Sequence, residues 1–86
     1  MTLEWSTEKD ELLKKHRNIS FKDIALEIEQ DRYEIDKNPT REGQVIFYVT
    51  LSHIKHKIVV PAVPTHHGYF LKTAHQSRKE TKRRLK

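Results

Sequence analysis

The residues best suited to chemistry lie in the last two fifths of the chain. Residues 53–86 hold nine Lys or Arg, one acidic residue and five of the six histidines. Histidine transfers protons near neutral pH because its unperturbed pKa is about 6.5. Arginine binds two oxygens of one anionic group through its planar fork. His75 and Arg78, three residues apart, are therefore candidates for proton transfer and for stabilising a phosphate.

Each of these residues also has an ordinary alternative. A solvated arginine at the start of a helix and a surface or half-buried histidine are common in proteins. The same holds for the His66-His67 pair, which precedes Gly68 in a turn, and for Lys9 in a polar helix. A run of charges such as the basic terminus is in many proteins only a solvated face.

The charge is distributed unevenly along the chain. Residues 1–52 carry eight Lys or Arg and eleven Asp or Glu, although the net charge of the whole chain is +5. An acidic half and a basic half indicate two surfaces with different partners, and the basic one suits a phosphate backbone or an acidic protein. The residues we expect to contact such a partner are Lys72, Lys79, Lys82, Arg83 and Arg84, with Tyr48 as an exposed ring suited to stacking on a base if the partner is a nucleic acid.

Composition excludes several other classes. There is no cysteine, so disulfides and thiolate metal sites are absent. His53-x2-His56 with His66-His67 is a weak metal pattern without nearby acids, and we expect no metal and no cofactor. No apolar run approaches the roughly 18 residues of a membrane span. The first residues are acidic and unlike a secretory signal, so we expect a cytoplasmic protein without a membrane partner.

The first half of the chain is predicted to contain a strand and two helices. The chain length predicts one domain, residues 1–86. Leu3 and Trp5 have strand spacing, and Ser6 or Thr7 then caps a helix with acids first and bases last. Ser20 caps a second helix, over about 20–30, whose apolar stripe is Phe21, Ile24, Ala25 and Ile28.

The second half is predicted to form three strands and a last helix. Residues 31–43 are predicted to form a loop. Three strands, 44–52, 57–63 and 69–75, are predicted to form an antiparallel meander. Pro61 marks an edge, a bulge or a strand end. Ser77 and Glu80 form a capping box that opens a basic helix, 77–86. The predicted order is β-α-α-β-β-β-α, an α+β fold with helices packed on one antiparallel sheet.

Both ends of the chain resemble the BrnT family of bacterial toxins. The stretch "LEWSTEKDELLKKHRNISFKD" is similar to the family's N-terminal signature through Trp5, Lys9, Lys15-His16 and Ser20-Phe21. The stretch "SRKETKR" resembles its closing helix, where an Arg-Lys pair follows Ser77. The order of predicted elements agrees with the family as well, so the resemblance spans nearly the whole chain.

The resemblance implies a RelE-like fold and a function. Members cleave RNA without a metal and arrest translation, as toxins of type II toxin–antitoxin systems. Each is neutralised by an antitoxin with a DNA-binding domain, and only the complex contacts operator DNA. The expected catalytic residues here are Arg78, His75, His67 and Lys9. Arg17 replaces a family glycine, and His67 stands where the family carries an arginine thought to matter for activity.

A second hypothesis needs no catalysis. The same basic surface would serve a module that binds nucleic acid or a protein partner without turnover. It is motivated by the lack of an unambiguous catalytic triad in the sequence. It predicts binding that weakens steeply with salt.

Overall fold

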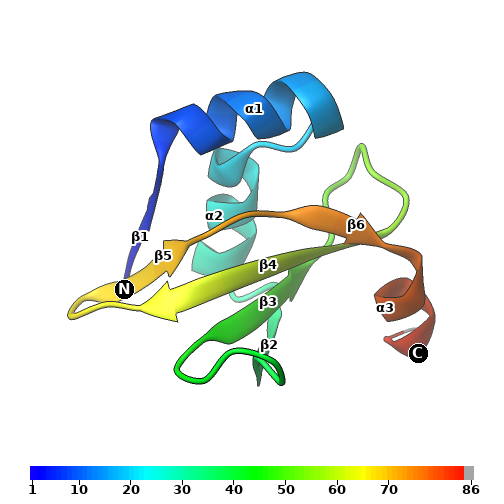
Figure 1. The fold of residues 1–86 in the computed structure, drawn as a ribbon. Coiled ribbons are helices and arrows are strands. Elements are labelled where there is room, and N and C mark those ends of the chain that lie inside the picture. Colours follow the sequence, from blue (N-terminus) through cyan, green and yellow to red (C-terminus); the bar gives the residue numbers. More distant parts are fainter. Residues whose placement is uncertain (85–86) are drawn as a thin grey trace.

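Six strands and three helices make up residues 1–84, the part of the chain that the computed structural model describes (Figure 1). The protein is thus α+β, as the sequence predicts. The elements are β1 (Thr2–Trp5), α1 (Thr7–Arg17), α2 (Phe21–Glu29), β2 (Glu34–Lys37), β3 (Val45–Val49), β4 (Lys57–Pro64), β5 (Gly68–Leu71), β6 (His75–Ser77) and α3 (Arg78–Arg83). The predicted C-terminal helix extends to residues 85 and 86, which lie outside the described residues.

The sheet is mixed, whereas the sequence predicts an antiparallel one. Its order is β1-β5-β4-β3-β2, and β6 pairs with β4 beyond the end of β5. All pairs are antiparallel except β1 with β5. Gly68 permits that parallel pairing, because a Cβ at this position would lie 1.9 Å from the carbonyl oxygen of Thr2. Nothing local to residues 2–5 indicates a partner so far along the chain.

The strand β2 lies in a segment predicted to be loop. It pairs with β3, and all four of its side chains are exposed. An exposed, charged edge strand lacks the apolar alternation that identifies strands from sequence. The prediction of a continuous loop over residues 31–43 is therefore wrong in its first half.

The predicted third strand, 69–75, is two strands. Both β5 and β6 pair with β4, and residues 72–74 between them are not in the ladder. Lys72 still donates its backbone N–H to the carbonyl of Pro61, at 2.8 Å. Pro61 lies opposite this break. It has no N–H to offer a neighbouring strand, so the pairing is interrupted there.

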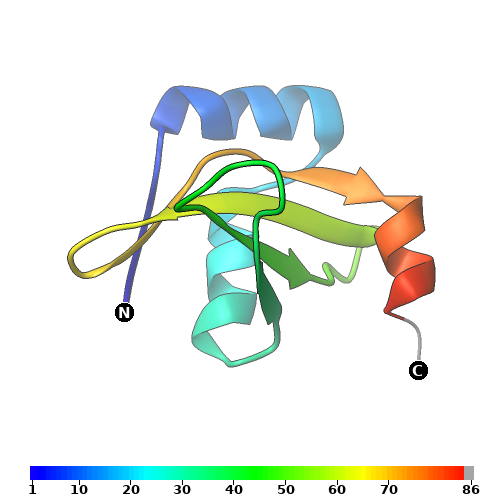
Figure 2. The same cartoon turned by 60° about the horizontal axis from the view of Figure 1, so that its bottom comes forward.

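The core lies between one face of the sheet and the helices α1 and α2 (Figures 1 and 2). Along each central strand every second side chain points into it, as the pleat requires. The fully buried large side chains are Phe21, Phe47, Ile19, Ile24, Ile28, Ile58, Leu71, Val49 and Val60. The other face carries Ile46, Tyr48, Val59 and Pro61. Of the three described helices, α3 is the one that reaches it, at one end.

Asp10 joins the two core helices. Its carboxylate is buried and accepts the backbone N–H of Phe21 at 2.9 Å. Phe21 opens α2, where backbone N–H groups have no partner within the helix. Lys14, one turn along α1, lies 3.0 Å from the same carboxylate. Ser20 caps α2 as predicted, through Lys22, but the contribution of Asp10 comes from a different element.

Replacing Asp10 with alanine is expected to lower the free energy of unfolding by about 1–3 kcal/mol, because the N–H of Phe21 is left buried without an acceptor. Urea denaturation at pH 7 measures this. Glu11→Ala is the matched control, since its exposed side chain has no such contact, and its effect should stay within about 0.5 kcal/mol. Equal losses in the two variants would refute the assignment.

Candidate functional site

A groove lies on the face of the sheet opposite the core. Its volume is about 540 Å³. Ile46, Val59 and Pro61 from the two central strands form an apolar floor. The rim is polar, and its residues are Asn38, Thr40, Arg41, Gln44, Lys72, Thr73 and His75.

The strand pairings place these side chains together. Ile46 lies opposite Pro61, and Val59 lies opposite His75, so the floor and one wall follow from register. The break between β5 and β6 brings Lys72 to the same groove. Arg41 comes from the β2–β3 loop. Two backbone hydrogen bonds fix the conformation of this loop. The N–H of Asn38 donates to the carbonyl of Gln44 at 3.0 Å, and the N–H of Gln44 donates to the carbonyl of Arg41 at 3.2 Å.

The groove has the electrostatic character of an anion site. Within residues 1–84 its lining includes Arg41, Lys72 and His75 and no acidic side chain. Partial burial, together with the nearby guanidinium of Arg17, lowers the pKa of His75 below the usual 6.5. Arg17 is held there by a hydrogen bond of 2.7 Å to the carbonyl of Ala74. The lowered pKa favours the neutral imidazole at pH 7, which is the form that accepts a proton.

Two of the sequence-predicted site residues, Lys72 and His75, meet at this groove. Arg78 opens α3 three residues after His75, and its exposed side chain forms no ion pair with the described residues. Lys79 and Lys82 are exposed on the same helix. Arg83 is exposed too and pairs with Glu80 at 3.2 Å. The cations of α3 thus follow His75 closely in the sequence, but they are not among the residues that line the groove.

The other two predicted catalytic residues lie elsewhere. His67 is exposed in the β4–β5 turn, at the end of the sheet away from α3 (Figures 1 and 2). Lys9 belongs to the first turn of α1, on the side of the sheet that the core helices cover. The fold therefore does not gather Arg78, His75, His67 and Lys9 into one cluster.

Tyr48 and Arg84 form a contact that the sequence does not reveal. We predict from sequence that Tyr48 is exposed, but it is only 7% exposed. The guanidinium carbon of Arg84 lies 3.5 Å from the centre of its ring. The same guanidinium contacts Glu34 at 2.7 Å, Asp36 at 2.8 Å and Glu80 at 3.1 Å. We predict from sequence that Tyr48 stacks on a base and that Arg84 binds the RNA backbone. In the structure the ring of Tyr48 is covered by Arg84, and Arg84 is paired with carboxylates.

The physical effect of this contact is to offset part of the negative charge of Glu34 and Asp36 beside the groove. Burial disfavours the charge of Arg84, but its hydrogen bonds to Asp36 and Glu80 outweigh that effect and raise its pKa. Asp36 lies opposite Ile46 of the groove floor. Without Arg84, it and Glu34 would repel a polyanion at close range.

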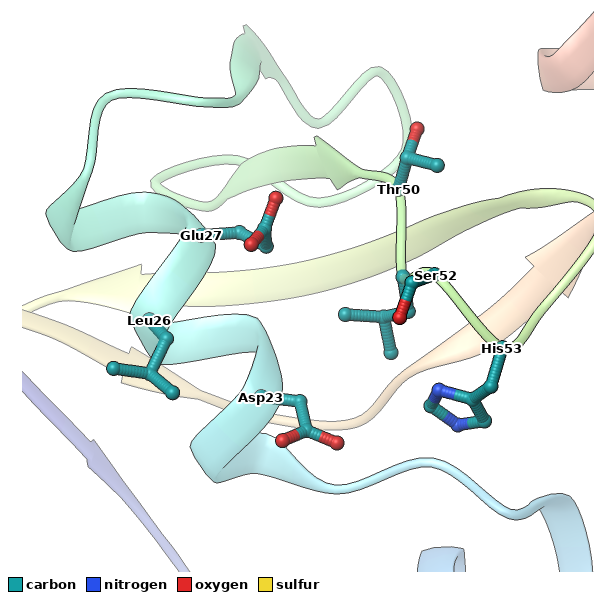
Figure 3. A pocket seen from close by; sticks show the side chains of 7 residues that line it. Asp23, Leu26, Glu27, Thr50, Ser52 and His53 are labelled. Atoms are coloured by element: carbon teal, nitrogen blue, oxygen red, sulfur yellow. The ribbon is translucent and has the colours of Figure 1, made fainter.

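A different hollow, of about 420 Å³, lies beside α2 (Figure 3). Asp23, Leu26 and Glu27 reach it from the helix, and Thr50, Ser52 and His53 from the segment after β3. Its two carboxylates make it a poor site for a polyanion. His53 lies 2.8 Å from the carbonyl of Asn18, a contact that holds the ring in place.

Three observations bear on other functions. Residues 1–84 contain no group of three or more His, Asp or Glu arranged to hold a metal ion. None of the described helices has the length and apolar character to cross a membrane. No protein-family model matches the chain, and no curated protein sequence matches it. The chemistry of the groove residues is therefore the basis for a functional proposal.

Proposed function

We propose that this protein is a metal-independent ribonuclease that acts as a BrnT-like toxin of a type II toxin–antitoxin pair, with a RelE-like fold. One observation supports it above all: a groove lined by Lys72, His75 and Arg41, with no acidic residue in its described lining. Cationic groups beside an apolar floor suit a nucleotide, whose phosphate and base need both. The resemblance of both chain ends to the BrnT family supplies the reaction.

The proposed reaction is transesterification within RNA. The neutral imidazole of His75 takes the proton of a ribose 2′-hydroxyl, and the 2′-oxygen attacks the adjacent phosphorus. Arg41 and Arg78 stabilise the charge that grows on the phosphate oxygens. The bond from phosphorus to the 5′-oxygen breaks, and the ammonium group of Lys72 donates a proton to that oxygen. The products are a 2′,3′-cyclic phosphate and a 5′-hydroxyl.

The partners follow from the same proposal. The substrate is RNA, and the cations of α3 (Lys79, Lys82 and Arg83) contact its backbone. An antitoxin with a DNA-binding domain neutralises the protein in the cytoplasm, and operator DNA is bound through that complex. The exposed cations of α3 form a surface that an acidic antitoxin segment complements.

Expression in bacteria is expected to arrest growth, and Arg78→Ala to relieve the arrest, because the phosphate loses a bidentate cation. Growth curves and labelling of new protein measure this. Arg32→Ala is the matched control: Arg32 is exposed and paired with Glu27, outside the groove, and that variant should stay toxic. A harmless wild-type protein that also leaves purified RNA intact would overturn the enzyme proposal.

The alternative is a non-catalytic module that binds nucleic acid or protein through the same cations. Its motivation in the structure is that His67 and Lys9 lie away from His75. Incubation of the purified protein with RNA separates the two functions. Fragments ending in a 2′,3′-cyclic phosphate exclude the module, whereas salt-sensitive binding without any fragments supports it.

A further inference from the structure

A second hollow adjoins the groove at His75. Its volume is about 570 Å³, and it lies where α1 ends against β6. Its lining brings together two segments far apart in the sequence: Lys15, His16, Arg17, Asn18 and Ile19 from the end of α1, and His75 and Gln76 from β6. His75 lines both hollows, so a chain lying in the groove can continue over the sheet edge into this one.

The second hollow is basic. In the described part of the chain its lining includes Lys15, Arg17 and two histidines but no carboxylate. One nitrogen of the Arg17 guanidinium donates to the Ala74 carbonyl at 2.7 Å. That bond fixes the group in place and leaves the rest of its donors for a ligand. Lys15 is exposed on the last turn of α1.

One feature opposes an anion here, since a helix carries partial negative charge at its carboxyl end. The end of α1 reduces that effect. The backbone N–H groups of Asn18 and Ile19 both donate to the carbonyl of Leu13. His53 contacts the carbonyl of Asn18 at 2.8 Å. Full side-chain charges on Lys15 and Arg17 therefore outweigh the partial charges that remain.

We propose that this hollow is a second phosphate-binding subsite, so that the protein binds a single-stranded RNA segment running from the groove, past His75, to the end of α1. The proposal rests on the proposed function and deepens it. A single strand is required because only an unpaired base can lie on the aliphatic floor of the groove. The nucleotide in the groove meets Lys72 and Arg41, and the phosphates beyond it meet Lys15 and Arg17.

The test measures binding of 2′-O-methyl oligonucleotides, which lack the hydroxyl that cleavage needs. The double variant Lys15→Gln/Arg17→Gln is expected to bind an eight-nucleotide strand at least tenfold more weakly at low salt. The slope of log K against log salt should become less steep by about 1.4, since each phosphate contact on a single strand contributes about 0.7. A dinucleotide, which fills only the groove, should bind almost equally to both proteins.

Lys22→Gln/Lys55→Gln is the matched control, because it removes the same charge from exposed positions outside both hollows. Its affinity should fall less than threefold. Lys15→Gln alone guards against a folding defect from losing the Arg17–Ala74 bond, and it should account for about half of the change in slope. Equal losses in the control, or an unchanged slope in the double variant, would overturn the subsite.

An acidic peptide is the competing ligand. If poly-glutamate loses affinity in the double variant while the oligonucleotide does not, the hollow binds protein and the proposal is wrong. The subsite and the ribonuclease function fail separately. A wild-type protein that cleaves RNA, with a double variant that binds normally, refutes only the subsite. A slope change without any cleavage by the wild-type protein refutes only the enzyme.

Discussion

His75→Ala is expected to lower kcat/KM for RNA cleavage about 10²- to 10⁴-fold, the range that a positioned general base contributes. This residue combines the two properties a base needs. It lines the groove with Lys72 and Arg41, where the proposed mechanism places the phosphate. Its pKa is lowered by partial burial and by Arg17, so the proton-accepting form predominates at pH 7.

The pH dependence has a defined sign. A base must be neutral to act, so kcat/KM should rise with pH as His75 loses its proton. Because the pKa of His75 is lowered from its usual 6.5, the half-maximal point should fall below pH 6.5 and the rate should level off near pH 7. Arg17→Gln removes the nearby positive charge and should move that point to higher pH.

His66→Ala is the control for His75→Ala. His66 is exposed in the β4–β5 turn, at the opposite end of the sheet from α3, and its variant should keep its rate within about twofold and its pH profile unchanged. Addition of imidazole to His75→Ala should restore part of the rate. A His75→Ala enzyme that retains the acidic limb of the profile would show that another group is the base.

The helix starts were predictable because their causes are local. Ser6, Ser20 and Ser77 each cap the helix that follows, through hydrogen bonds to Lys9, Lys22 and Glu80. A capping bond spans two or three residues, so it can be read directly from the sequence. The apolar stripe of α2 is equally local, and all four of its predicted residues are buried.

The features that the sequence did not predict depend on distant partners. The parallel pairing of β1 with β5 requires a glycine at position 68, because a side chain there would clash with the backbone of Thr2, more than sixty residues away. β2 is a strand because β3 offers it an edge, since its own side chains are all exposed. Asp10 looks like an ordinary first-turn acid, and only the fold places it against Phe21.

The candidate site likewise contains residues that the sequence predicts and residues that only the fold brings there. Composition and charge predict a basic C-terminal half, and two of its residues, Lys72 and His75, share one groove. Arg41 was not predicted because its loop reaches the groove only through the pairing of β2 with β3. A buried Tyr48 was not predicted either: its position on the outer face of β3 indicates exposure unless another element covers it, and Arg84 does so.

Arg84→Ala is expected to release α3 from the sheet. The helix buries no residue of its own. It is held to the sheet by the contacts of Arg84 with Tyr48, Glu34 and Asp36 and by the bond from the Lys57 backbone N–H to the Thr81 hydroxyl at 2.6 Å. Its side chain is 11% exposed, whereas those of Glu34 and Asp36 are 47% and 58% exposed. Solvent weakens these two pairs. We therefore expect a loss of about 1–2 kcal/mol, including the contact with the ring.

Hydrogen exchange of the α3 amides measures this release, and exchange should accelerate about 5- to 30-fold, the factor that a loss of about 1–2 kcal/mol gives. Arg84→Lys should recover little of the protection, since one ammonium cannot contact three carboxylates and a ring face as the guanidinium does. Arg83→Ala is the matched control. Arg83 is 65% exposed with one partner, so its loss should leave the exchange of α3 nearly unchanged.

Arg84→Ala should also weaken RNA binding at the groove, because Glu34 and Asp36 then act as free negative charges beside it. The triple variant Arg84→Ala/Glu34→Gln/Asp36→Asn separates this effect from the release of α3. With the carboxylates gone, affinity for a 2′-O-methyl oligonucleotide should rise clearly above that of Arg84→Ala, while α3 still exchanges quickly. The part of the affinity that is not recovered measures what the docked helix contributes through Lys79 and Lys82. If the triple variant binds no better than Arg84→Ala, repulsion by Glu34 and Asp36 is not the reason that Arg84 matters for binding.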